Sequence, residues 1–147
     1  MNAPDAYNPD EALKLDNQLC FPLYAAARKI VGAYTPYLKP LGLTYTQYIT
    51  FMVLWEQDGL TVGEIGSRLR LDNGTLTPML KKMEKQGYVD RRRSPDDERR
   101  VMVYLTEQGR AMKAKLADVP RQIGRCVPLE PDEAQSLYRI LYKILDN

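Results

Sequence analysis

The stretch that decides the fold is Thr61–Leu105, TVGEIGSRLRLDNGTLTPMLKKMEKQGYVDRRRSPDDERRVMVYL. Its first half predicts two short helices in succession. Thr61 and Glu64 form a capping box at the start of the first helix. Asp72 is a good N-cap for a second helix over residues 73–86, in which apolar residues recur at helical spacing.

The second half predicts a β-hairpin. Residues 88–92 and 101–105 alternate apolar and polar side chains, and Ser94–Asp97 between them supplies turn chemistry. Two short helices followed by a two-stranded hairpin make a winged helix-turn-helix. Pro78 conflicts with this prediction, because proline is disfavoured inside a helix. The sequence leaves open whether the first turn of the second helix is irregular or the helix bends at Pro78.

The segments upstream predict two more helices. Thr44 and Gln47 form another capping box, which opens a helix that is apolar nearly all round and therefore expected to be buried. Before it, apolar residues between positions 20 and 41 recur every three or four residues, the spacing of one helix face. We expect Pro36 to kink this helix and Gly42 to end it.

Downstream of the hairpin we expect one long helix from 107 to about 125 and a last helix that begins at Pro131. A winged-helix module closes in about 60 residues, so the long helices at both ends have apolar surface that two-fold dimerisation would cover. The alternative is that they pack on their own module in a monomer. The fold class is mainly α with a small β-hairpin wing, in one intertwined domain: an arm over 1–14, a winged helix-turn-helix over 44–105, and a helical dimerisation region over 15–43 and 106–147.

Composition excludes most enzyme classes. The 147 residues include no histidine, which removes Ser-His-Asp and Cys-His catalysis and HExxH zinc sites. Cys20 and Cys126 lie far apart without a CxxC pair, so neither a structural metal site nor a disulfide framework is expected. We therefore expect no enzyme, no cofactor and no metal. No apolar run is long enough for a membrane span and no signal peptide is recognisable, so we expect a cytoplasmic protein with no membrane partner.

The charge distribution points to DNA. The formal net charge is only +2, yet residues 81–100 carry eight basic and five acidic side chains. A helix fits the major groove, where its N-terminal residues reach base edges, and an arginine-edged hairpin can place a guanidinium in a minor groove. Each cation alone is usually solvated surface, but the helix pair, the polar helix tip and the basic hairpin together favour DNA binding. The residues expected to contact DNA are Asn73, Thr75, Thr77, Lys81, Lys82, Arg91, Arg92, Arg93, Arg99 and Arg100.

The arrangement resembles the MarR family of dimeric winged-helix repressors, particularly in Asp97-Glu98-Arg99 followed by Leu105-Thr106. Three stretches narrow the resemblance to the OhrR group of organic hydroperoxide resistance regulators: Leu-Asp-Asn-Gln-Leu-Cys-Phe at 15–21, Leu-Thr-Tyr-Thr-Gln-Tyr at 43–48, and Gly-Thr-Leu-Thr-Pro-Met-Leu-Lys-Lys-Met-Glu at 74–84. The resemblance runs from about residue 13 through nearly the whole chain.

The resemblance implies specific roles. Cys20 matches the peroxide-sensing cysteine, and Tyr34 and Tyr45 match two tyrosines that hydrogen-bond this sulfur from the partner subunit. Arg99 matches a wing arginine that enters the minor groove, and Asp97 matches the acid that braces it. Cys126 falls where one branch of the group has a resolving thiol. The implied partners are a second copy of the chain, double-stranded operator DNA with an inverted repeat, and an organic hydroperoxide as inducer.

The residues around Cys20 fit a sensor. If Pro22 marks the first turn of a helix, Cys20 lies at the helix N-terminus, where the dipole and free N–H groups favour the reactive thiolate. A cysteine considered by itself is more often a small core hydrophobe, and Cys126 is alternatively a spectator thiol in a loop. Peroxide would oxidise Cys20 to a sulfenic acid, which Cys126 of the other subunit would condense to a disulfide. The sequence leaves open two other end states, the sulfenic acid itself and a mixed disulfide with a small thiol.

The sequence therefore predicts a redox-sensing repressor that binds operator DNA as a reduced dimer and is released when organic hydroperoxide oxidises Cys20. The alternative is a repressor of the same fold induced by a small aromatic ligand without cysteine chemistry. A thiol peroxidase, which would consume peroxide continuously, and a structural winged-helix protein without DNA contact are further alternatives.

Overall fold

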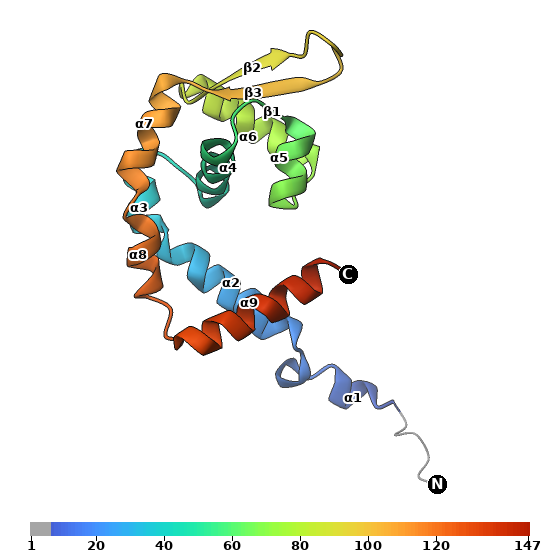
Figure 1. Cartoon of the computed structure of the whole chain (residues 1–147). Coiled ribbons are helices and arrows are strands. Elements are labelled where there is room, and N and C mark those ends of the chain that lie inside the picture. The colour runs from blue at the N-terminus through green and yellow to red at the C-terminus, as the bar shows by residue number, and fades with distance from the viewer. Residues whose placement is uncertain (1–6) are drawn as a thin grey trace. The chain divides into compact units, whose positions relative to one another are not determined.

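Residues 34–119 form one unit, called here the winged-helix unit, and the segments up to Ala33 and from Pro120 form a second, the terminal unit. The computed structural model describes residues 7–147 (Figure 1). No helix of this described part of the chain has both the length and the apolarity to cross a membrane.

The winged-helix unit begins with a turn of short helices. These are α3 (Thr35–Leu38) and the 3-10 turn η2 (Lys39–Leu41), and the left-handed Gly42 with φ 68° closes the turn. Next comes α4 (Tyr45–Glu56), which opens with the predicted Thr44–Gln47 capping box and buries most of its surface, as expected.

Two further helices follow α4. Helix α5 (Val62–Leu69) has the predicted Thr61–Glu64 capping box, and α6 (Asn73–Lys85) starts at the Asp72 N-cap. Helix α6 is continuous through Pro78. The missing N–H of Pro78 leaves only the carbonyl of exposed Gly74 without its helical partner, and water can satisfy that carbonyl there. Pro78 therefore lies inside a helix that continues on both sides of it.

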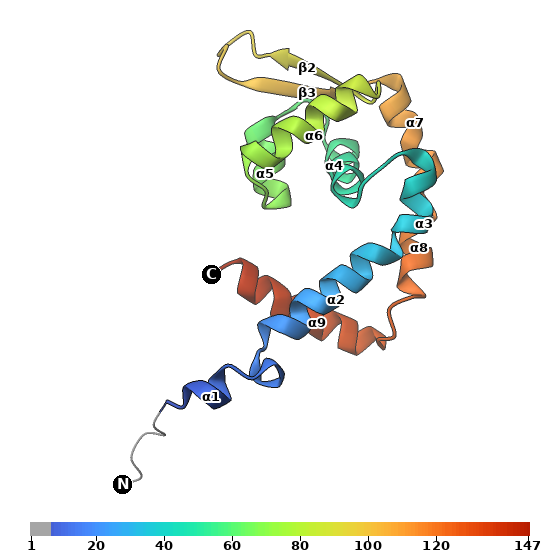
Figure 2. The same ribbon diagram turned by 180° about the vertical axis from the view of Figure 1, so that it is seen from behind.

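The predicted hairpin is confirmed as β2 (Val89–Arg93) and β3 (Val101–Leu105), paired antiparallel with Val89 opposite Leu105. A third strand, β1 (Leu60–Thr61), pairs with β3 on its other edge and gives the order β1-β3-β2. Figure 2 shows α6 running along the hairpin with α5 beside it. The two-stranded expectation missed β1, which is only two residues long and is defined by its pairing with β3.

The core of the winged-helix unit lies between α4, α5, α6, α7 (Glu107–Leu116) and the inner face of the sheet. Helix α7 starts at the predicted Thr106 cap. The core side chains are apolar and come from each of these elements at the predicted spacings. They are Phe51, Leu54, Ile65, Leu76, Leu80, Met83, Val89, Val103 and Met112.

Two expectations about helix ends are wrong. The long helix over 107–125 is interrupted: α7 ends at Leu116 and α8 spans Val119–Gly124, because Pro120 cannot donate to the carbonyl of Leu116. Similarly, the helix over 20–41 does not merely kink. Helix α2 (Cys20–Ala33) stops before Pro36, and a new helix starts there.

The described part of the N-terminal arm and the residues after it contain two short helical turns. A helical turn, α1 (Pro9–Ala12), is capped by the Asn8 side chain, and a 3-10 turn, η1 (Leu15–Asn17), follows it. Residues 1–6 of the predicted arm lie outside the described residues. The last helix, α9 (Pro131–Leu145), begins at Pro131 as predicted.

The helices α2 and α9 of the terminal unit bury no residue in the single chain. Their apolar side chains are therefore left in contact with solvent, which is unusual for so many large residues in one unit. They are Phe21, Leu23, Tyr24, Ile30 and Val31 on α2, and Leu137, Tyr138, Ile140, Tyr142, Ile144 and Leu145 on α9.

Candidate functional site

The leading end of α6 is polar and exposed. The Asp72 carboxylate accepts hydrogen bonds from the backbone N–H of Thr75 at 2.8 Å and from its hydroxyl at 3.2 Å. These bonds hold the pKa of Asp72 below its ordinary value. Asn73 and Thr75 are exposed and Thr77 is half-buried, so the first turn of α6 presents short polar side chains to solvent.

An open hollow of about 560 Å³ lies where α6, the start of α5 and the hairpin meet. The structure brings five of the predicted DNA-contacting residues together around it. The hollow is lined by Asn73 and Thr77 of α6, by Arg91, Arg99 and Arg100 of the hairpin, and by residues of 61–67. Lys81 and Lys82 lie further along α6, exposed and outside the hollow.

The tip of the hairpin holds Arg99 in an extended position. The Asp97 carboxylate accepts from Nε of Arg99 at 3.1 Å and from Nη2 at 3.4 Å, while the Arg99 side chain remains 91% exposed. The hydrogen bond from the Arg99 side chain holds the pKa of Asp97 below its ordinary value. Asp97 therefore stays ionised at neutral pH and fixes the direction of a solvent-facing guanidinium.

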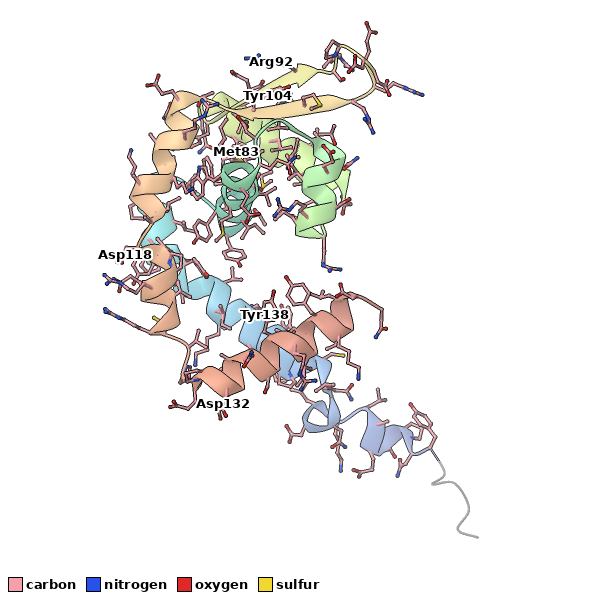
Figure 3. The ribbon with its side chains drawn as sticks, viewed as in Figure 1. Met83, Arg92, Tyr104, Asp118, Asp132 and Tyr138 are labelled. Atoms are coloured by element: carbon pink, nitrogen blue, oxygen red, sulfur yellow. The ribbon has the colours of Figure 1, made fainter. Side chains whose placement is uncertain are left out.

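The remaining hairpin cations are oriented by other groups. The Arg92 guanidinium lies 5.3 Å from the centre of the Tyr104 ring on the adjacent strand (Figure 3). Arg93 donates to the carbonyl of Glu98 at 2.7 Å. Both side chains are exposed, but Arg92 lies on the outer face of the hairpin beside Tyr104, whereas Arg93 shares the face of the buried Val89.

Glu84 is a partner of Arg91 that the sequence analysis missed. Its carboxylate accepts from the backbone N–H of Arg91 at 3.0 Å and from the Arg91 Nε at 3.1 Å. The backbone hydrogen bond is the main cause that lowers the pKa of Glu84. This pair joins the last turn of α6 to β2. An acid in the last turn of a helix, where the dipole disfavours it, was the available sequence signal.

The two cysteines are free and exposed, and both belong to segments of the terminal unit. Cys20 is the first residue of α2, and Pro22 lies in the first turn, as expected. Cys20 therefore belongs to the first turn of α2, where backbone N–H groups have no helical partner. Cys126 follows α8, and its thiol donates to the carbonyl of Gln122 at 3.5 Å.

The structure brings Tyr34 and Tyr45 together and adds Tyr48, forming what we call the tyrosine cluster. The ring centres of Tyr34 and Tyr45 are 4.9 Å apart, and Tyr48 lies 5.4 Å from Tyr34 and 6.2 Å from Tyr45. Burial raises the pKa of all three phenols, so they remain protonated hydrogen-bond donors at neutral pH. Within residues 7–147, none of the three hydroxyls has a hydrogen-bond partner.

Sequence reasoning had placed Tyr48 only in the apolar run of α4. Its position three residues after Tyr45, on the same helix face, was the signal that could have added it to the cluster. As for metals, no group of three or more potential ligands gathers among the described residues.

Comparisons with known proteins agree with this geometry. The sequence model of the family described as transcriptional regulator SarA/Rot matches residues 33–116. The chain is 45% identical over 139 residues to the organic hydroperoxide resistance transcriptional regulator of Bacillus subtilis, with 95% of each chain covered. It is 48% identical over 123 residues to the HTH-type regulator SarZ of Staphylococcus aureus, covering 84% of this chain and 83% of that one.

Among solved structures, the chain is similar to AbfR of Staphylococcus epidermidis. Reduced AbfR bound to DNA matches with a TM-score of 0.77 and 35% identity, over 93% of this chain and 95% of that one. AbfR has also been solved overoxidised and bound to DNA, and in a disulfide-formed state, with TM-scores of 0.76 and 0.64.

The matches to the Bacillus subtilis regulator and to AbfR cover 95% and 93% of this chain. They confirm the resemblance stated from the sequence, including the similarity to the organic hydroperoxide regulators. They also place the protein among regulators of transcription rather than among enzymes. The chain belongs to the MarR and SarA family of winged-helix transcriptional regulators.

Proposed function

We propose that this protein is a transcriptional repressor that binds operator DNA as a reduced homodimer and is released when an organic hydroperoxide oxidises Cys20. The observation that carries the DNA-binding part is the hollow at which the tip of α6 and the hairpin arginines meet. A major-groove helix and a minor-groove arginine must approach one duplex together, and only a shared surface permits this. The relative AbfR, solved with DNA in its reduced state, supports the proposal.

In this proposal the first turn of α6 contacts base edges and the cations set affinity. Asn73, Thr75 and Thr77 offer short donors and acceptors to the major groove, while Lys81 and Lys82 neutralise phosphates. Arg99, aimed by Asp97, enters the minor groove beside the half-site. The other hairpin cations, Arg91, Arg92, Arg93 and Arg100, add phosphate contacts or orient the hairpin.

The dimer follows from the uncovered helices of the terminal unit. A stable fold does not leave two helices with exposed apolar faces, and a second copy of the same faces covers both. Two-fold symmetry then places one α6 per half-site, so the operator is an inverted repeat with half-sites one helical turn apart.

The sensing step uses the thiolate of Cys20 at the start of α2. The sulfur attacks the distal oxygen of the hydroperoxide, the O–O bond breaks, and the departing alkoxide takes up a proton from solvent, so the products are Cys20 sulfenic acid and an alcohol. Sulfur is oxidised and the peroxide is reduced. The tyrosine cluster of the partner subunit supports this step, because its unpartnered hydroxyls are donors that favour a sulfur anion.

The second step joins the two subunits. The thiol of Cys126 in the partner attacks the sulfenic sulfur, water leaves, and an intersubunit disulfide forms. A disulfide needs Cα atoms within about 7 Å, so its formation moves the helices that hold the two DNA-reading elements in register. The exposure of both thiols and the disulfide-formed state of AbfR support this step.

The test compares operator binding by wild type and Cys20→Ser, each with and without cumene hydroperoxide. The operator probe is a duplex selected from a random-sequence library with the reduced protein. We expect peroxide to abolish binding by the wild type only. If Cys20→Ser is released equally, the cysteine has no role, and an inducer such as an aromatic ligand must be sought instead.

The disulfide is tested separately by non-reducing gel electrophoresis after peroxide treatment. Wild type should form a covalent dimer and Cys126→Ser should not. A covalent dimer of Cys126→Ser would exclude Cys126 as the resolving thiol while leaving the sensing role of Cys20 intact.

A further inference from the structure

The side chain of Gln86 links the end of α6 to the turn before α4. Gln86 is the C-cap of α6, and its backbone N–H donates to the carbonyl of Lys82 at 2.9 Å. Its side-chain Nε2 donates to the carbonyl of Gly42 at 3.1 Å, and its Oε1 accepts from Nε2 of Gln47 at 3.0 Å. One amide therefore bonds to both sides of the segment that opens α4.

Gln47 is held rigidly on the other side of this link. Its side chain is 1% exposed and completes the capping box: its Oε1 accepts from the backbone N–H of Thr44 at 3.1 Å, and its own N–H donates to the Thr44 hydroxyl at 3.3 Å. A buried amide that loses a partner is costly, so Gln47 moves only together with the start of α4. That start is Tyr45, a member of the tyrosine cluster.

The turn itself is pinned by the cluster. It runs from Tyr34 to Tyr45, whose rings are 4.9 Å apart, so the cluster joins the two ends of the turn. Inside it, the N–H of Gly42 donates to the carbonyl of Lys39 at 3.0 Å, and Leu43 donates to Leu38 at 3.1 Å. These bonds make the turn stiff, and they tie the Gly42 carbonyl to the segment whose two ends meet in the tyrosine cluster.

Beyond Gln86 the chain enters the wing directly. Gly87 takes a left-handed conformation with φ 83°, and its carbonyl accepts from the hydroxyl of Thr106 at 2.6 Å. Tyr88 donates to Met83 in the last turn of α6 at 2.9 Å, and β2 begins at Val89. The end of α6 and the start of the wing are thus one rigid corner, and Gln86 is the residue that ties this corner to the turn.

We propose that Gln86 is a positioning residue that couples the tyrosine cluster to the DNA-reading surface. When oxidation of Cys20 withdraws the sulfur from the cluster, the stiff turn from Tyr34 to Tyr45 shifts as one piece, and Gln86 transmits this shift to α6 and the wing. The proposal rests on the proposed function, because it assigns a route for the regulation described there. The contacts of Gln86 all lie inside the winged-helix unit.

The test uses the full-length protein with Gln86→Met, which keeps the length of the side chain and removes both hydrogen bonds, and with Gln86→Ala as a second variant. Gln57→Met is the matched control, since Gln57 is the exposed C-cap of α4 and its side chain makes no such link. Fluorescence anisotropy measures affinity for the selected duplex before and after cumene hydroperoxide, and sulfenic acid trapping measures the oxidation rate of Cys20.

We expect reduced Gln86→Met to bind the duplex within about twofold of wild type and Cys20 to be oxidised at the wild-type rate. The affinity of the reduced protein for the duplex, divided by the affinity of the oxidised protein, should fall by at least about fivefold. This is the factor by which one net hydrogen bond changes an equilibrium constant. Gln86→Ala should behave alike and Gln57→Met should keep the wild-type ratio. A residue with a merely structural role is not expected to lower this affinity ratio while the oxidation rate of Cys20 stays unchanged.

Three results would overturn the proposal. They are an unchanged ratio in both Gln86 variants, a loss of reduced affinity as large as the loss of the ratio, and a slower oxidation of Cys20 that accounts for the change. Failure of the proposed function looks different, because in that case the wild type itself does not respond to peroxide.

Discussion

Replacement of Glu84 by Gln tests the link between the last turn of α6 and the hairpin. The glutamate accepts two hydrogen bonds from Arg91, one from its backbone and one from its guanidinium. Glu84→Gln keeps an oxygen that accepts from the backbone and removes the charge that attracts the guanidinium. The variant therefore removes both the charge and the acceptor of the Arg91 Nε without creating a cavity.

The geometry sets the size of the effect. Hydrogen bonds to a charged group contribute about 1.5–3 kcal/mol, whereas exposed ion pairs contribute about 0–1 kcal/mol. The side chains of Arg91 and Glu84 are 21% and 38% exposed, between these two cases. After allowance for solvent screening we expect a loss of about 1 kcal/mol at neutral pH, which lowers the Tm by roughly 2–4 °C for a chain of this size.

The lowered pKa of Glu84 determines how its contribution to stability changes with pH. The pKa of Glu84 is lowered in the folded protein, chiefly by the N–H of Arg91. Its stabilisation is therefore complete above the unfolded pKa of about 4.3 and is lost as the pH falls through the lower folded pKa. The difference between wild type and Glu84→Gln should be constant from pH 7 to 5 and should shrink below about pH 4.

Urea unfolding followed by circular dichroism at a series of pH values measures this difference. Glu56→Gln is the control, because Glu56 pairs with Arg68 on the exposed surface and should change stability little. A gap that persists unchanged to pH 3, or one no larger than that of the control, would refute the assignment of an ionic link between α6 and β2.

Three further predictions concern the DNA contact, the sensor and the core. Arg99→Ala should weaken operator binding and reduce the slope of log affinity against log salt concentration by about one, measured by anisotropy; an unchanged slope would place Arg99 outside the interface. Tyr45→Phe should slow the peroxide oxidation of Cys20 by about tenfold, the effect of one hydrogen bond of about 1.5 kcal/mol to the thiolate, in stopped-flow assays; wild-type kinetics would argue against the cluster as donor. Gly109→Ala should lower the Tm by at least roughly 4 °C, because the added Cβ would lie 2.2 Å from the carbonyl oxygen of Tyr88, and a wild-type Tm would contradict the close approach of α7 to Tyr88.

Local signals predicted most of the fold correctly. The capping boxes of Thr44 and Thr61 and the cap of Asp72 gave the starts of α4, α5 and α6 to the residue. These signals succeed because the donor and acceptor are three residues apart, so the sequence contains the whole interaction. Proline positions were less decisive: Pro78 is accommodated within α6, whereas Pro120 separates α7 from α8.

The candidate site was predicted in its residue types and only partly in its geometry. The hairpin turn placed Asp97 and Arg99 two residues apart, where their contact is local. Tyr48 and Glu84 were missed, since each gains its role from a neighbour across a turn. The strand β1 was missed for the same reason, because two residues become a strand only when Val103 and Met102 pair with them.

By itself the sequence determined where the helices of the winged-helix unit begin, which faces of them are apolar, and which short polar and basic residues stand at the tip of α6 and along the hairpin. Only the tertiary structure decided that Arg91 is held by Glu84, that three tyrosines share one cluster, and that Gln86 joins the end of α6 to the turn before α4. The physical reason is the distance along the sequence over which each interaction acts. Caps, turns and periodicities act over three or four residues, whereas the bond between Gln47 and Gln86 joins residues 39 positions apart, and its existence depends on how the helices pack.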